Sequence, residues 1–341
     1  MKSSSKRVIW FIVGVLIIFS ITFIPLPYYI TKPGLAEELE PIVKVEGGYK
    51  EDGSLMLTTV RIGKATPLSY VLAQFQDFSH LYKEEEILGE NESNEEYNTR
   101  QLHMMEMSQE SAIAIAYEKA DKDIEYKYDG VYVMAVAPDM PADGILKTGD
   151  VVTKVDNKLV KHSEDLISYV EGKKAGDKVS VTFKRNGKVK TETITLEQLK
   201  VLNNRVGMGI SLVTDFDISV DPKVKINSEE IGGPSAGLMF SLEIYNQLTK
   251  DDLTKGRQIA GTGTINEKGE VGEIGGIEQK IVAADKAGAE IFFAPNNHGA
   301  KNSNYQNALK AAKQIDTDMK VVPVDTFDDA VSYLNKMPEK E

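Results

Sequence analysis

The chain has 341 residues, of which 41% are hydrophobic and 27% are charged, enough apolar material for two or three folded modules. It contains no cysteine, which excludes disulfides and thiolate metal sites. Its formal net charge of −12 at pH 7 disfavours nucleic acid as a partner, and we expect none.

The N-terminal stretch has the composition of a membrane anchor. Residues 8–24 carry no charge, and the uncharged run continues to Ile30, which meets the lower limit of about 20 residues for a span. We therefore predict a cytoplasmic N-terminus at 1–7, a transmembrane helix over 8–30 and a body outside the cytoplasm.

The charges around this stretch determine the predicted orientation. The N-terminal region up to Gly34 holds four basic side chains and no acidic one, so the rest of the chain carries a formal charge of −16. Lys2, Lys6 and Arg7 precede the apolar run and Lys32 alone follows it, which predicts that the N-terminal side is cytoplasmic. A cleaved signal peptide is the alternative, although its apolar core is usually shorter than this run.

After the anchor, the pattern predicts a β-hairpin and then two helices. The hairpin strands are expected at 41–45 and 54–62, joined by a glycine-rich turn. The helices are expected at 67–87 and 107–120, with Ser108 as a candidate N-cap of the second.

A different pattern begins near residue 125. An apolar strand is expected at 130–136, a short helix at 163–170, and a hairpin of 178–183 with 189–196 around an Arg-Asn-Gly turn. This order resembles a PDZ domain of the bacterial protease type, and we assign it to residues 125–199.

The resemblance implies a peptide-binding groove. In PDZ domains, a loop offers backbone N–H groups to a peptide carboxylate, and the peptide adds a strand beside the helix. A packing or regulatory module that binds no peptide is the alternative. The residues that the resemblance implies for the loop and the groove wall are Gly130, Val131, Tyr132, Val133, Leu166 and Val170.

Residues 206–230 are expected to form strands. From Asp217 onward apolar and polar side chains alternate, and Pro222 interrupts the run, which indicates a sheet edge or a break. Such an edge could pair with the backbone of a peptide. An ordinary edge strand guarded by Lys223 and Lys225 is the alternative with equal weight.

A serine follows two glycines and a proline at 232–235, directly before a helical pattern. Because proline is favoured at the first helical position, Ser235 is expected in the first turn, near unpaired backbone N–H groups. A hydroxyl there could attack a carbonyl while those amides stabilise the oxyanion. A serine helix cap is the alternative.

A lysine lies on the apolar face of a second predicted helix, which Gly276 opens and Gly288 closes. Lys280 shares its arc of the helix with isoleucine and alanine side chains. A lysine in apolar surroundings either extends its amine to water or loses its proton, and a neutral amine can act as a general base. Both alternatives remain open for Lys280 alone.

Together these segments resemble the catalytic domain of Lon-type serine endopeptidases. The matching motifs are Gly-Pro-Ser-Ala-Gly at 233–237, Thr-Gly at 262–263 and Gly-Gly-Ile-x-x-Lys at 275–280. The resemblance implies Ser235 as nucleophile, Lys280 as base and Thr262 as a hydroxyl near the lysine, with Gly233 and Pro234 in support. The family often has an acidic residue where this chain has Gly232, so we assign no role to that position.

The remaining pattern completes an α/β domain. Strands are expected at 291–295 and 321–324, and helices at 308–312 and 327–334. We assign the catalytic domain to 200–341, with its first part at 37–124 and the PDZ domain inserted between them. The expected fold class is therefore an α/β Lon-type protease domain with an inserted mainly-β PDZ domain and one N-terminal transmembrane helix.

Other chemistries have weaker support in the sequence. None of the four histidines stands in a triad motif, and only His298 is a candidate partner for Ser235. The chain has no His-Glu-x-x-His motif and no Gly-x-x-x-x-Gly-Lys-Ser/Thr loop, so we expect no metal, no ATP and no other cofactor.

The whole arrangement resembles membrane proteases of the YlbL/SepM type from Gram-positive bacteria. The resemblance implies an ATP-independent endopeptidase at the cell membrane that cleaves exported peptides or small membrane proteins outside the cytoplasm. A catalytically inactive, membrane-tethered PDZ adaptor is the alternative. The oligomeric state stays open.

Overall fold

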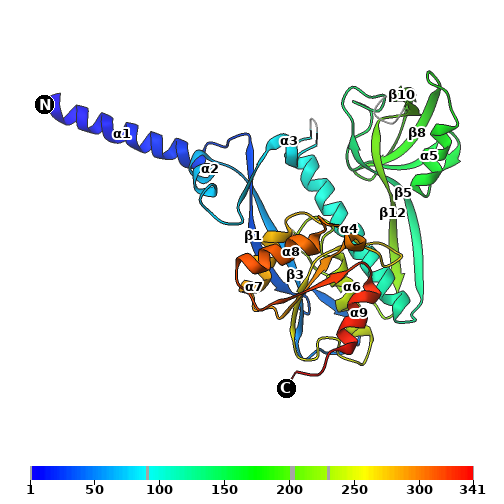
Figure 1. Ribbon diagram of the computed structural model, residues 1–341. Coiled ribbons are helices and arrows are strands. Elements are labelled where there is room, and N and C mark those ends of the chain that lie inside the picture. Colours follow the sequence, from blue (N-terminus) through cyan, green and yellow to red (C-terminus); the bar gives the residue numbers. More distant parts are fainter. Residues whose placement is uncertain (1, 90–91, 200–203, 229–230, 341) are drawn as a thin grey trace.

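The computed structural model describes residues 2–89, 92–199, 204–228 and 231–340. Helix α1 (Lys2–Phe23) projects away from the rest of the chain (Figure 1). Most of its large apolar side chains from Val8 onward are exposed. A membrane-spanning helix, judged by length and apolarity together, is not found among the residues that the structure describes.

A six-stranded sheet forms the centre of the protein body, in the order β18-β17-β14-β3-β1-β4. The four strands from β18 to β3 are parallel, and β1 and β4 continue the sheet in antiparallel pairs. These strands are β1 (Tyr28–Glu38), β3 (Ser54–Lys64), β4 (His80–Lys83), β14 (Gln258–Gly261), β17 (Ile291–Pro295) and β18 (Lys320–Val324).

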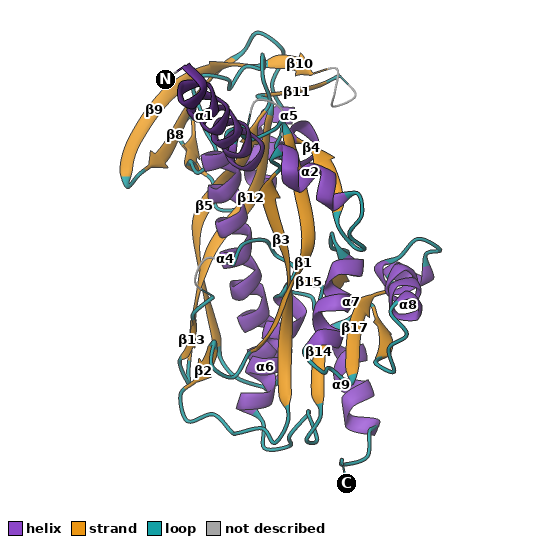
Figure 2. Ribbon diagram, turned by 90° about the vertical axis from the view of Figure 1, so that its left-hand side faces the viewer, coloured by secondary structure: helices purple, strands orange, loops and turns teal. Residues whose placement is uncertain are grey.

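Helices cover both faces of this sheet (Figure 2). Alternate side chains of a strand point to opposite faces, so Leu55 and Leu57 of β3 join one apolar core while Met56 joins the other. The first core is covered by α4 (Asn94–Lys119), α6 (Gly237–Leu248) and α9 (Phe327–Lys336). The second is covered by α7 (Ile277–Lys286) and α8 (Asn304–Gln314).

A second sheet with its own apolar core lies to one side, in the order β12-β5-β6-β8-β9. Its long strands β5 and β12 run from this sheet back to the protein body (Figure 1). Helix α5 (Ser163–Glu171) covers it. The strands are β5 (Ile124–Val136), β6 (Val151–Val155), β8 (Lys178–Arg185), β9 (Lys188–Thr195) and β12 (Ile210–Val220), with β7 (Lys158–Leu159) paired to β6.

Three short strand pairs complete the sheets. Strand β2 pairs with β13, β10 with β11, and β15 with β16. Their bounds are β2 (Val43–Val45), β13 (Val224–Ile226), β10 (Glu197–Leu199), β11 (Arg205–Gly207), β15 (Thr264–Ile265) and β16 (Val271–Gly272).

The predicted hairpin of 41–45 with 54–62 is wrong. Strand β3 pairs with β1, and β2 pairs with β13 instead. The sequence obscured β1 because its first residues, Tyr28 to Ile30, continue the uncharged run of the N-terminus. Tyr29 and Ile30 are buried in the sheet, so the predicted anchor segment 8–30 ends inside a strand.

Both predicted helices of this region have different bounds. The stretch 67–87 divides into α2 (Pro67–Ala73), β4 and α3 (Glu84–Ile87). The helix expected at 107–120 begins earlier, because Ser93 caps α4 and Ser108 lies within it. The polar first half of α4 has no continuous apolar stripe that would predict a helix.

The later predictions agree better with the structure. Pro222 separates β12 from β13, as the interrupted alternation indicated. Helix α7 lies between Gly276 and Gly288, and the last strands and helices match β17, α8, β18 and α9. The predicted domain boundary at residue 200 lies outside the described residues.

Candidate active site

Ser235 lies in the turn that leads into α6, two residues before the helix begins at Gly237. The expected place in the first helical turn is therefore wrong. The first N–H groups of the helix are already hydrogen-bonded within the protein. Gly237 N donates to the carbonyl of Pro234 at 3.4 Å, and Leu238 N donates to the carbonyl of Gly263 at 3.1 Å. Those bonds fix the turn against the neighbouring strand segment.

The backbone of Ser235 is held from one side by residues 262 and 263. Its carbonyl accepts hydrogen bonds from Thr262 Oγ1 and from Gly263 N, both at 2.9 Å. Thr262 is fully buried. The hydroxyl of Thr262, expected near the lysine, therefore positions the serine backbone.

Helix α4 holds the other side of the same turn. Gly233 N donates to the carbonyl of Gln101 at 2.9 Å, and Ser108 Oγ donates to the carbonyl of Pro234 at 3.0 Å. Gly233 has a φ of +86°, a conformation that glycine adopts without strain. The serine turn is thus fixed by two elements that are far from it in sequence.

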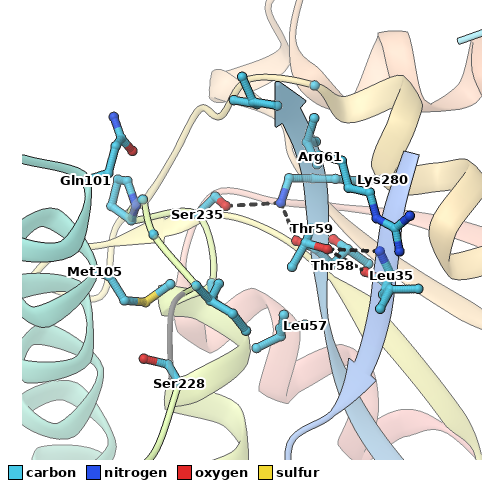
Figure 3. A pocket seen from close by; sticks show the side chains of 18 of the residues that line it. Leu35, Leu57, Thr58, Thr59, Arg61, Gln101, Met105, Ser228, Ser235 and Lys280 are labelled. Carbon is cyan, nitrogen blue, oxygen red and sulfur yellow. Dashed lines mark hydrogen bonds between the residues drawn. The ribbon is translucent and has the colours of Figure 1, made fainter. Parts of the chain in front are cut away.

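The amine of Lys280 meets the hydroxyl of Ser235 (Figure 3). Lys280 projects from α7 and is only 3% exposed. Its Nζ donates to Ser235 Oγ at 3.0 Å and also to the carbonyl of Thr58. Both partners are uncharged, so burial is not offset by a carboxylate and lowers the pKa of Lys280 to about 7.

An open cleft of about 930 Å³ surrounds this pair. Its walls come from β1, β3, α4, the serine turn and the start of α7. The buried side chains of Leu57 and Met105 line it near Ser235, and Arg61 lies further along β3 (Figure 3). Such a cleft can admit an extended peptide to the serine hydroxyl.

Not every residue of the Gly-Pro-Ser turn can offer a backbone N–H group to an oxyanion. Gly233 N–H is occupied by the Gln101 carbonyl, and Pro234 has no N–H to offer. On this turn, the N–H groups of Ser235 and Ala236 make no hydrogen bond to a described residue. They are the backbone donors that can hold a developing oxyanion.

The histidine alternative has no geometric support. His298 lies in the short 3₁₀ helix Asn297–Gly299, with its side chain 86% exposed. Its Nδ1 is 4.0 Å from Asp325, whereas the hydroxyl of Ser235 bonds to Lys280. Across the described part of the chain, no cluster of three or more histidine and acidic side chains could hold a metal ion.

The predicted peptide-binding loop of the PDZ-like segment is wrong. Its residues lie within β5, and both edges of that strand are occupied: Val131 pairs with Thr214 of β12 and with Val152 of β6. No peptide strand can be added there. The residues concerned are Gly130, Val131, Tyr132 and Val133.

A groove of about 290 Å³ lies instead between α5 and the first part of β12, and Leu166 and Val170 line it. Strand β12 is the edge of its sheet, so it has an edge that can pair with a peptide. Sequence order misled the prediction, because the strand beside the helix follows α5 in the chain.

The supporting roles of three residues escaped the sequence analysis: Thr58, Gln101 and Ser108, the last of which was expected only as a helix cap. The first binds the lysine amine, and the other two hold the serine turn. Each lies more than 120 residues from its partner, and none stands in a motif. The packing of α7 against β3 and of α4 against α6 brings them to the site.

Comparisons with known proteins find two kinds of domain in this chain, with overlapping bounds. Residues 106–196 match the PDZ domain family, and residues 169–336 match the Lon protease (S16) C-terminal proteolytic domain. Neither match includes β1 and β3, which supply the central sheet with two strands.

Curated relatives are Lon proteases. The chain is 30% identical over 155 residues to Lon protease of Metamycoplasma arthritidis, covering 45% of this chain and 17% of the relative. It is 33% identical over 129 residues to that of Campylobacter jejuni, covering 34% and 15%. The chain thus spans less than a fifth of the length of these relatives.

Solved structures match the PDZ part. The PDZ domain of an SdrC-like protein from Listeria monocytogenes is 40% identical and covers 26% of this chain and 90% of its own, with a TM-score of 0.24. The corresponding domain from Listeria innocua is 39% identical and covers 25% and 93%, with a TM-score of 0.23. The family matches assign a PDZ domain and a serine endopeptidase domain of the Lon type to this chain.

Proposed function

We propose that this chain, which contains a Lon-type serine endopeptidase domain and a PDZ domain, cleaves peptide bonds with Ser235 as nucleophile and Lys280 as general base. The observation that supports this most strongly is the 3.0 Å contact between the buried amine and the serine hydroxyl. A pKa of about 7 leaves much of that amine neutral near neutral pH, as a base requires.

In the first half of the reaction, neutral Lys280 takes the hydroxyl proton as Ser235 Oγ attacks the scissile carbonyl carbon. The electron pair of the C=O bond moves to oxygen, where the N–H groups of Ser235 and Ala236 stabilise it. When the intermediate collapses, the C–N bond breaks and the Lys280 ammonium gives its proton to the leaving amine.

In the second half, water attacks the acyl-enzyme and Lys280 accepts its proton. The ester C–O bond then breaks, the proton returns to Ser235 Oγ, and the carboxylic product leaves. Thr262, Gln101 and Ser108 contribute by position, because they hold the serine turn through hydrogen bonds to its backbone. A positioned general base typically contributes about 10²–10⁴-fold to rate.

The wider setting is also a proposal. A single-pass anchor at the N-terminus, with the catalytic body outside the cytoplasm, is supported by the uncharged run 8–24, its basic flank and the exposed apolar side chains of α1. Suitable substrates are exported peptides or small membrane proteins. ATP-independent action is supported by the absence of a phosphate-loop motif from these 341 residues.

The domain division 37–124, 125–199 and 200–341 belongs to the same proposal. It is supported by the sheet that β1 and β3 share with β14, and the separate core of the β5–β12 sheet supports a PDZ unit that extends past residue 199 to Met208 and the first part of β12. In this arrangement the PDZ domain engages substrate in the groove beside α5.

A proteolysis assay tests the dyad. The full chain in detergent micelles is incubated with casein, beside Ser235→Ala, Lys280→Ala and Lys286→Ala. The last is a matched control, because Lys286 lies on the same helix but is exposed. We expect cleavage by wild type and Lys286→Ala only. Silence from all four proteins would favour the inactive PDZ adaptor.

Peptide binding tests the groove. Ile167 lines it and is 42% exposed, so Ile167→Glu places a charge in the groove at little cost to folding. With Ser235→Ala as background, we expect it to weaken binding of a labelled peptide with an apolar C-terminus roughly tenfold. Ser168→Glu, on the neighbouring exposed position, is the control and leaves binding unchanged.

A further inference from the structure

Helix α2 presents its apolar side chains to the outside. Val71 is 53% exposed and Phe75, just beyond the helix, is 82% exposed. Leu68 and Leu72 share this outer face, because spacings of three and four residues return to the same side of a helix. Surface helices of soluble domains usually have the opposite arrangement, with the apolar stripe turned inward.

The segment is also uncharged. No acidic or basic residue occurs from Ala65 to Gln76, in a chain of which 27% is charged. Thr66 and Ser69 form a capping box, and Pro67 stands in the first turn, so the short helix is well defined. A defined helix with an exposed apolar face indicates an interaction surface.

Hydrogen bonds tie this surface to the end of α1. Leu26 N donates to the carbonyl of Ala65 at 2.7 Å, and Ala65 N donates to that of Tyr28 at 2.8 Å. The ring of Tyr70, on the inner face of α2, packs edge-on against Tyr28 with centroids 5.1 Å apart. Helix α2 therefore holds a fixed place beside the chain that leaves α1 (Figure 1).

Exposed apolar residues continue from one helix to the other. Phe23 and Ile24, at the end of α1, are 64% and 52% exposed. The outer face of α2 thus extends the apolar surface of α1 sideways at the point where a membrane anchor would leave the bilayer. A helix with an exposed apolar face beside a membrane anchor can lie in the membrane interface with that face among the acyl chains.

We propose that the outer face of α2, defined as Leu68, Val71, Leu72 and Phe75, inserts into the interface of the lipid bilayer that the proposed anchor α1 crosses. This inference rests on the proposed anchor. The insertion fixes the orientation of the protease body relative to the bilayer. Strand β4, which follows α2, places Tyr82 in the wall of the cleft, so the cleft opens near the membrane surface and suits membrane-proximal peptide segments.

Tryptophan quenching tests the contact, because Trp10 in α1 is the only tryptophan of the chain. The full chain is reconstituted into phosphatidylcholine–phosphatidylglycerol vesicles whose acyl chains carry bromine at a shallow or a deep position. Wild type reports on α1 through Trp10. The double variant Trp10→Phe/Phe75→Trp reports on α2.

Trp10→Phe/Tyr49→Trp is the matched control. Tyr49 is 45% exposed and lies in the loop before β3, at the opposite end of that strand from α2. We expect the tryptophan at position 75 to lose about half its fluorescence, more with shallow than with deep bromine, and the tryptophan at position 49 to lose none.

The outcomes separate the two proposals. Quenching of Trp10 without quenching at position 75 overturns the α2 contact and leaves the anchor standing. Quenching at position 75 without quenching of Trp10 supports the α2 contact and overturns the anchor. Absence of quenching at both positions overturns both proposals. An α2 face that packs against a second copy of the chain and binds no lipid would also give no quenching at position 75, and that result overturns the α2 contact.

Discussion

Two buried titratable sites lie on opposite sides of the central sheet: Lys280 on α7, and the pair Glu51–Glu243 beside α6. Lys280 has a hydroxyl and a carbonyl as partners, and burial lowers its pKa from 10.5 to about 7. Burial and mutual repulsion raise the pKa of Glu51 from 4.5 to about 9, and burial raises that of Glu243 to about 7. Burial favours the uncharged form of the side chains at both sites, but of the two sites only that of Lys280 borders a cleft.

The glutamate pair has a structural role. Glu243 is fully buried, and Asn246 Nδ2 donates to Glu51 Oε2 at 2.9 Å. One carboxyl oxygen of each residue has no hydrogen-bond partner among the described residues, which raises the cost of a second negative charge. The pair therefore binds the loop before β3 to α6 while it keeps a proton.

The two sites have opposite effects on stability as pH changes. Between pH 7 and 10.5 the unfolded state binds a proton at Lys280 that the folded state lacks, so stability rises with pH across this window. At the glutamate pair the folded state binds more protons from pH 4.5 upward. The stability that the protonated pair adds to the folded state is fully present below pH 4.5 and is lost as pH rises through about 7 to 9.

Lys280→Met gives the largest expected effect. Loss of the base should reduce cleavage by about 10²–10⁴-fold. The same variant should unfold at higher temperature, because an apolar side chain replaces a buried amine; the gain at pH 6 is roughly 1–4 kcal/mol. The gain should shrink as pH rises toward 10.5, above which wild-type Lys280 is neutral in both states. Calorimetry measures the stability and casein cleavage measures the activity. A variant that loses both activity and stability at pH 6 would contradict the claim that burial of the Lys280 amine costs stability.

The Thr262→Val variant tests how the backbone of Ser235 is held in the active site. Valine keeps the shape but removes the hydroxyl that holds the Ser235 carbonyl at 2.9 Å. We expect kcat to fall about tenfold, which corresponds to roughly 1.4 kcal/mol, with the pH profile unchanged. A shifted pH midpoint would mean that Thr262 acts on the lysine, as the family resemblance implied.

Glu243→Gln gives the smallest effect on activity. Because Glu243 lies away from the cleft, cleavage should stay within about twofold of wild type. The variant should lose less stability than wild type between pH 5 and 9, by roughly 1–2 kcal/mol at pH 9. Glu51→Gln should give a larger change, because the pKa of Glu51 is raised further, to about 9. Equal denaturation midpoints for all three proteins across this pH range would contradict a protonated pair.

The sequence predicted those parts of the site that lie in local motifs. Ser235 and Lys280 were assigned because the short motifs that contain them, at 233–237 and 275–280, resemble those of Lon-type endopeptidases. Thr58 and Gln101 were missed because their roles depend on strand pairing and helix packing between distant segments. The predicted PDZ binding loop failed for the same reason: the resemblance implied a loop that includes Val131, yet strands on both sides pair with this residue.

The rate at which a fluorophosphonate probe labels Ser235 tests the central claim most directly, because labelling reports nucleophile activation without substrate binding. The full chain is labelled from pH 5 to 10, and the labelled serine is identified by mass spectrometry. The account predicts a rate that rises with pH through a midpoint near 7, persists in His298→Gln and is lost in Lys280→Met. The same pH profile in Lys280→Met would contradict it.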